Sequence, residues 1–210
     1  MNSLILKDFI SLKSYSKSLA IIIGFFTIIT FTNDELSFLS GMIILIMSML
    51  PITSFSYDQH AKWDLFSQTL PVSRKQLVMS KYVLGIISIV AGAILAILLN
   101  VAVLLVKSLE VDIWYLILAN SLIALVALLY LSILIPLVYK FGVEKSRLLT
   151  IVVLAIPSVL AIALSKAGVS IPVLDEITPA IVVAIGLVFV VCVMLISYVI
   201  SVRIYMNKEF

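Results

Sequence analysis

Apolar runs recur six times along this sequence of 210 residues. Most of them approach the roughly 20 residues that a helix needs to cross the apolar core of a bilayer. Hydrophobic residues make up 63% of the chain and charged residues only 12%, whereas about a quarter of a soluble domain is charged. A water-soluble core of this size cannot bury so much apolar surface. The sequence therefore predicts an all-α integral membrane protein.

A single transmembrane domain, 1–210, with six helical spans follows from these runs. The expected spans are 18–32, 36–57, 82–106, 113–139, 148–165 and 179–202. The first is the shortest, because its uninterrupted apolar stretch covers only 19–31 and the preceding Tyr15-Ser16-Lys17 must extend to the interface for it to cross. A signal peptide is the competing interpretation, but Asn33-Asp34-Glu35 follow the run where a small-residue cleavage site is expected.

Basic residues are distributed unequally between the two sides of this six-span arrangement. With the amino terminus inside, all but two of the 14 lysine and arginine residues lie on the inner side, the exceptions being Lys107 and Lys166. Both termini are therefore expected in the cytoplasm, because basic segments resist translocation. Every basic cluster adjoins a span, so topology and anionic lipid explain the positive charge better than nucleic acid does.

Motifs that carry chemistry are missing from the sequence. No ionisable residue lies in the middle of an expected span, which disfavours proton- or sodium-coupled transport. The chain has no His-Glu-x-x-His, no Gly-x-Ser-x-Gly and no Walker phosphate loop. The only histidine, His60, and the only cysteine, Cys192, lack partners at metal-ligand or disulfide spacing. We expect no enzymatic activity, cofactor or metal in this chain, and we expect any ATP chemistry to come from another chain.

A few polar or helix-breaking residues lie inside the expected spans. Pro51, Pro136 and Pro157 are expected to kink their helices and to free carbonyl groups that neighbouring helices satisfy. Asn100, near the outer end of the third span, is expected to link two helices through a hydrogen bond. These residues are interpreted as structural.

The longest inner loop, 58–81, connects the second and third spans and is expected to form two helical pieces joined at Pro71. In the first piece an apolar stripe at helical spacing starts from Gln59 and comprises Trp63, Phe66 and Leu70. The first piece should end at Leu70, because the residue before a proline avoids helical geometry.

Charged and polar pairs support this division of the loop. Asp58 and Lys62 stand four residues apart in the favourable acid-first order. Ser73 and Gln76 have the spacing of a capping box, which predicts a second helix that starts there and runs into the third span. The apolar stripe of the first piece has two interpretations that the residues alone do not separate: burial in the membrane surface, or docking in a groove of a cytoplasmic partner.

The string Leu70-Pro71-Val72-Ser73-Arg74 is followed by Ser80-Lys81-Tyr82 at the mouth of a span, and the acidic Asp58 comes just after the second span. This pattern resembles the ABC-type exporter permeases of the bacitracin and lantibiotic resistance group. The layout of six spans, internal termini and a basic amphipathic leader is similar too. Within that group the chain most resembles the permeases of phenol-soluble modulin exporters. The group commonly has glutamate at the position of Asp58.

The resemblance implies that the loop is a coupling helix, seated in a cleft of an ABC-type ATPase subunit. Apolar side chains would fill the cleft, a charged pair would orient the helix, and a rigid elbow would lead into the third span. The implied ATPase-coupling residues are Asp58, Lys62, Trp63, Phe66, Leu70, Pro71 and Arg74. Residues 2–17 would form an elbow helix along the inner headgroups, with Lys7, Lys13 and Lys17 at that surface.

The resemblance further implies a working unit of two identical permease chains and two ATPases, which bind the ATP and magnesium. We expect a multi-pass permease subunit of the bacterial plasma membrane that exports amphipathic antimicrobial or cytolytic peptides. One alternative is a membrane scaffold or immunity protein that binds a cytoplasmic partner without transport. A second alternative is an uncoupled channel or small carrier.

Overall fold

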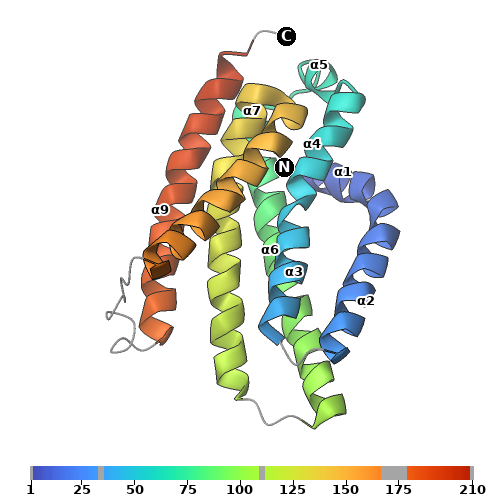
Figure 1. The fold of residues 1–210 in the computed structure, drawn as a ribbon. Coiled ribbons are helices and arrows are strands. Elements are labelled where there is room, and N and C mark those ends of the chain that lie inside the picture. The colour runs from blue at the N-terminus through green and yellow to red at the C-terminus, as the bar shows by residue number, and fades with distance from the viewer. Residues whose placement is uncertain (1, 33–35, 109–111, 167–178, 209–210) are drawn as a thin grey trace.

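A computed structural model describes residues 2–32, 36–108, 112–166 and 179–208, with only the helical path given for most of 153–166. The described residues form helices and no strands, as the sequence predicts. The elements are α1 (Asn2–Leu12), the short 3-10 helix η1 (Lys13–Tyr15), α2 (Ser16–Thr32), α3 (Leu36–Ser48), α4 (Leu50–His60), α5 (Trp63–Ser67), α6 (Arg74–Lys107), α7 (Ile113–Lys166) and α9 (Pro179–Met206) (Figure 1).

Five segments of the described chain are long and apolar enough to cross a membrane. They are Ser3–Thr32, Leu36–His60, Arg74–Lys107, Ile113–Val152 and Ala180–Met206. These segments contain four of the six predicted spans in full and all but the first residue of the last, 179–202. The remaining one, 148–165, continues the helical path of α7, but most of its side chains lie outside the described part of the chain. A sixth span and the orientation of the termini stay predictions.

The outer surface of the bundle is apolar over much of its length. Ile21 of α2 and Leu105 of α6 are 73% and 77% exposed, and Leu187 and Leu195 of α9 are more than half exposed. Soluble monomers rarely present such extended apolar surfaces. The exposed apolar side chains therefore fit helices that face lipid or other membrane helices.

Helix α6 lies inside the bundle and packs against α3, α7 and α9. The packing is close enough to require a small residue, because a Cβ atom added at Gly92 of α6 would lie 2.8 Å from the Cβ atom of Met47 in α3. Near the other end of the same helix pair, Asn100 Nδ2 donates a hydrogen bond to Ser40 Oγ at 2.7 Å. The predicted interhelical role of Asn100 is confirmed.

Two prolines shape the helices as the sequence predicts. The second span is broken at Met49, between α3 and α4, and Pro51 lies in the first turn of α4, where its missing N–H breaks the hydrogen-bond ladder. In α7, Pro136 cannot donate to the carbonyl of Ser132, four residues earlier. Ser197 of α9 donates its hydroxyl to that carbonyl instead. A neighbouring helix thus satisfies the acceptor that proline leaves without its usual donor.

Helix α7 consists of two legs that meet at Gly142. This residue has φ +79° and ψ 172°, a conformation that only glycine adopts without strain. In Figure 1 the second leg, drawn in orange, turns back from the first at the end of the bundle where α5 lies. A single residue therefore replaces the longer inner loop that separates the fourth and fifth predicted spans.

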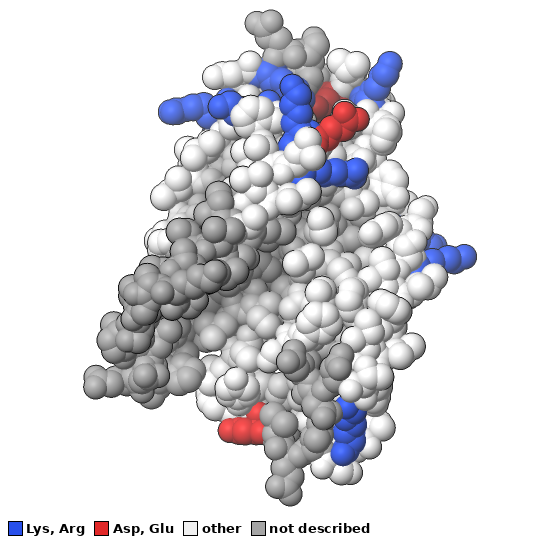
Figure 2. All heavy atoms as spheres, viewed as in Figure 1, with Lys and Arg blue, Asp and Glu red and all other residues white. Residues whose placement is uncertain are grey.

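Basic residues gather at one end of the bundle (Figure 2). This is the end that holds α5, the turn at Gly142 and the last turn of α9 (Figure 1). Lys107 ends α6 at the opposite end, where Asp112 also precedes α7. The charge asymmetry predicted from the sequence is therefore present in the fold.

Candidate functional site

The linker between α4 and α6 differs from the predicted pair of helices. Helix α4 continues past Asp58 to His60, and Lys62 then takes a left-handed conformation with φ +49°. Only five residues, Trp63–Ser67, form the following helix α5. The prediction of one helical stripe from Gln59 through Trp63 is wrong, because the chain reverses between those two residues. Asp58 also does not pair with Lys62 but with lysines of other helices.

The apolar side chains of α5 point in two directions. Trp63 packs against the main buried core of the bundle, and the Lys7 ammonium lies 4.1 Å from the centroid of its indole ring. Phe66 and Leu65 are each 55% exposed, while Leu70 is half-buried. The exposed apolar surface of the linker is thus the pair Leu65 and Phe66. Sequence spacing missed Leu65, because it assumed a helix phase that the reversal at Lys62 resets.

The second part of the linker forms as predicted. Ser73 caps α6: its hydroxyl accepts from the backbone N–H of Gln76, and the Gln76 side chain accepts from the N–H of Ser73. The guanidinium of Arg74 donates to the Met206 carbonyl at 2.8 Å and to Gln68 Oε1 at 3.3 Å. Arg74 therefore ties the linker to the end of α9. Pro71 is exposed between α5 and this cap.

A cluster of four charged residues, Lys7, Asp8, Asp58 and Lys81, joins α1, α4 and α6 beneath the linker. The Lys81 ammonium contacts Asp8 Oδ1 at 2.9 Å and Asp58 Oδ2 at 2.5 Å, and it donates to Ser54 Oγ at 2.7 Å. The side chains of Lys81 and Asp8 are only 6% and 1% exposed. Buried charges require such partners, because isolated ones are costly to remove from water.

Lys7 completes this four-charge cluster. Its ammonium contacts Asp58 Oδ1 at 2.5 Å and Asp8 Oδ1 at 2.9 Å. Each ammonium thus touches both carboxylates, and the cluster has no net charge. Lys7 was expected at the membrane surface together with Lys13 and Lys17, but its side chain is 24% exposed and turned inward, whereas Lys13 and Lys17 are exposed. Sequence spacing gives no sign of the cluster, since its helices are brought together only by the fold.

A second ion pair lies at the outer edge of the linker. Lys208 Nζ is 2.9 Å from Asp64 Oδ2, and both side chains are more than 40% exposed. The Tyr205 hydroxyl donates to Asp64 Oδ1 at 3.4 Å. Solvent screens this pair, so its contribution to stability is small. The contacts of Lys208 and Tyr205 with Asp64, together with the hydrogen bond from Arg74 to Met206, hold the end of α9 beside α5.

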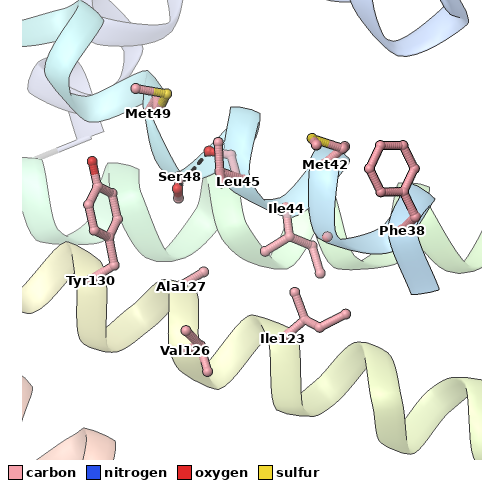
Figure 3. Close-up of a pocket in the computed structure, with 11 residues that line it drawn as sticks. Phe38, Met42, Ile44, Leu45, Ser48, Met49, Ile123, Val126, Ala127 and Tyr130 are labelled. Carbon is pink, nitrogen blue, oxygen red and sulfur yellow. Dashed lines mark hydrogen bonds between the residues drawn. The ribbon is translucent and has the colours of Figure 1, made fainter. Parts of the chain in front are cut away.

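An apolar cleft of about 350 Å³ opens between α3 and the first leg of α7 (Figure 3). Phe38, Met42 and Leu45 line it from α3, and Met49 lines it from the break between α3 and α4. Ile123, Val126 and Tyr130 line it from α7. The Tyr130 hydroxyl lies at the Met49 end of the cleft (Figure 3). Such a lining accommodates an apolar group and offers no charge to an ion.

Comparison with known proteins places the chain in a family. Neither the curated proteins nor the solved structures gave a match. A family model described as ABC-2 family transporter protein matches residues 3–206, a range that includes the four-charge cluster, the linker and every described helix in whole or nearly so. The chain therefore belongs to the ABC-2 family of transporter proteins and is a multi-pass protein of the plasma membrane.

Proposed function

We propose that this chain is the permease subunit of an ATP-driven exporter and takes its energy from two copies of a separate ABC-type ATPase. The observation that carries the proposal is α5, which presents Leu65 and Phe66 at the basic end of the bundle. Exposed apolar side chains on a short helix fit a groove on a partner protein. We place this end in the cytoplasm, because basic residues remain on that side.

The links between α5 and the spans support a role in force transmission. On one side, α5 follows α4, which forms the end of the second span. Asp58 of α4 joins that end to α1 and α6 through the four-charge cluster. On the other side, the Ser73 cap opens an uninterrupted helix of 34 residues that is long and apolar enough to cross a membrane. Leu65 and Phe66 would enter the ATPase cleft, while Trp63 and Arg74 would hold the linker to the bundle. A displacement of α5 would then move both spans.

Helix α1 fits the proposed elbow helix. It packs against α4 and α6 at the basic end, while Leu6, Phe9 and Ile10 are at least 42% exposed. Those side chains would enter the lipid interface, and Lys13 and Lys17 would meet the headgroups. Lys7 would serve the four-charge cluster rather than the membrane surface.

We propose an amphipathic antimicrobial or cytolytic peptide as cargo. Two observations support this substrate class: the apolar cleft between α3 and α7, and the absence of ionisable residues from the middle of the predicted spans. The similarity to phenol-soluble modulin exporters points the same way. Two copies of the chain would enclose the pathway. The chain itself would hold no cofactor and carry out no catalysis, since ATP and magnesium would bind to the partner.

Reconstitution with an ABC-type ATPase that co-purifies with this chain from its native membrane tests the proposal. In proteoliposomes, wild-type complexes are expected to show ATP hydrolysis that an amphipathic peptide stimulates and peptide transport that depends on ATP. The variant Leu65→Ala/Phe66→Ala is expected to bind the ATPase at least about tenfold more weakly, as for paired interface hot spots. It should still insert into the membrane. Leu105→Ala/Val106→Ala, a double change of exposed apolar residues at the opposite end, serves as the matched control.

Two results would contradict this function. Peptide flux by the permease alone, without ATPase, would indicate an uncoupled carrier. A complex that forms but shows neither stimulated hydrolysis nor transport would indicate a scaffold.

A further inference from the structure

A second groove, of about 420 Å³, runs between the first leg of α7 and α9. Ile133 and Leu137 of α7 and Ile196 and Ile200 of α9 form its walls. Ile196 and Ile200 are 62% and 47% exposed, so the groove opens to the surroundings of the bundle. It lies apart from the cleft between α3 and α7 and shares no lining residue with it.

The polar groups in the groove are already satisfied. The Ser197 hydroxyl lies 2.6 Å from the Tyr82 hydroxyl and donates to the Ser132 carbonyl. The Ser132 hydroxyl donates to the Leu128 carbonyl of its own helix at 2.9 Å. Between its ends the groove therefore offers a ligand apolar contact and no spare hydroxyl donor, which suits a hydrocarbon chain.

Two basic residues stand at one end of the groove. Lys140 lines it, with its ammonium 5.2 Å from the centroid of the Phe141 ring. Arg203 follows Ile200 by three positions and so lies on the same face of α9. Both side chains are exposed, and no carboxylate within the described ranges pairs with either. The end of the groove thus carries positive charge that a negatively charged ligand would complement.

The length of the groove matches one leaflet. Along α9 its lining extends from Val193 to Ile204, which is about 16 Å at the helical rise of roughly 1.5 Å per residue. Half of a hydrocarbon core of about 30 Å is about the same length. The basic pair belongs to the end of the bundle that holds α5, where headgroups of that leaflet would lie.

We propose that this groove binds an anionic phospholipid, with one acyl chain between α7 and α9 and the phosphate between Lys140 and Arg203. The site goes beyond the proposed export function, because it depends on neither the cargo nor the ATPase. It requires only the location of the chain in the membrane.

Native mass spectrometry of the full-length chain in neutral detergent tests the site. The probes are dioleoyl phosphatidylglycerol and dioleoyl phosphatidylcholine, titrated separately. Wild type is expected to retain one phosphatidylglycerol in preference to phosphatidylcholine. Lys140→Gln/Arg203→Gln is expected to bind phosphatidylglycerol about thirtyfold more weakly, because each basic residue at an anionic surface contributes about a factor of five. Lys62→Gln/Lys75→Gln, which removes two exposed lysines of the linker and the start of α6, should bind as wild type does.

A second variant tests the acyl-chain part of the site. Ile200→Trp, a change at a half-exposed position, should fill the groove and weaken the retention of both lipids. Equal retention of the two lipids by wild type would overturn the proposal, and so would unchanged binding in the Lys140→Gln/Arg203→Gln variant. A dimer that Ile200→Trp dissociates while lipid binding stays unchanged would show instead that a second copy of the chain covers the groove.

Discussion

Replacement of Lys81 by methionine is the sharpest test of the four-charge cluster. Methionine keeps most of the apolar stem and removes the ammonium that contacts Asp8, Asp58 and Ser54. Breaking a buried ion pair by removal of one partner costs about 3–5 kcal/mol. Lys7 still contacts both carboxylates in the variant, so we expect the lower value, about 3 kcal/mol.

Thermal unfolding in detergent, followed by the loss of the monodisperse peak after heating, provides the assay. A loss of about 3 kcal/mol corresponds to a fall in Tm of about 6–12 °C for a chain of this size. Lys208→Met is the matched control, because it breaks an ion pair whose side chains are 42% and 43% exposed. Such pairs contribute less than about 1 kcal/mol, so this Tm should change by no more than about 4 °C.

A second substitution distinguishes the ion cluster from simple packing. In the Lys81→Met variant, the ammonium of Lys7 alone faces two carboxylates. Asp8→Asn in this background removes one of them, so that Lys7 pairs with Asp58 alone. The double variant should therefore be more stable than Lys81→Met. The reasoning is refuted if Lys81→Met unfolds at the same temperature as Lys208→Met, or if Asp8→Asn destabilises the Lys81→Met protein further.

Two further predictions each compare a pair of substitutions. Gly142→Ala places a side chain at φ +79° and should destabilise the chain by about 1–3 kcal/mol, whereas Gly41→Ala, where an added Cβ meets no atom within 4 Å, should leave the Tm unchanged or raise it. Ser197→Ala removes the donor to the Ser132 carbonyl and should cost about 1–2 kcal/mol; Pro136→Ala in the same chain should recover part of that loss, since it restores an N–H. Equal Tm values for the two glycine variants, or no recovery with Pro136→Ala, would contradict these explanations.

Much of the fold follows from the sequence, because it depends on composition and on contacts close in the chain. The apolar runs predict the five spans that the described helices contain. The spacing of Ser73 and Gln76 predicts the start of α6, since a capping box is a local hydrogen-bond pattern. The role of Asn100 also follows, because a buried amide in an apolar helix needs a partner.

The candidate site could be predicted only in outline. The left-handed conformation of Lys62 has no local signature such as glycine, so the spacing of Gln59 and Trp63 indicated a continuous helix that the structure does not form. The four-charge cluster depends on Asp8 meeting Lys81 across 73 positions. Sequence spacing within one helix does not predict a contact between helices so far apart in the chain.

The central claim is that α5 lies in the cytoplasm and contacts an ATPase through its exposed apolar side chains. A single cysteine in place of exposed Thr69, two residues after α5, in a chain whose only native cysteine, Cys192, is replaced by alanine, reports on both parts of the claim without altering Leu65 or Phe66. A membrane-impermeant maleimide should label inside-out vesicles and not intact cells, and bound ATPase should block the labelling. Labelling of intact cells, or labelling that bound ATPase leaves unchanged, would contradict the account.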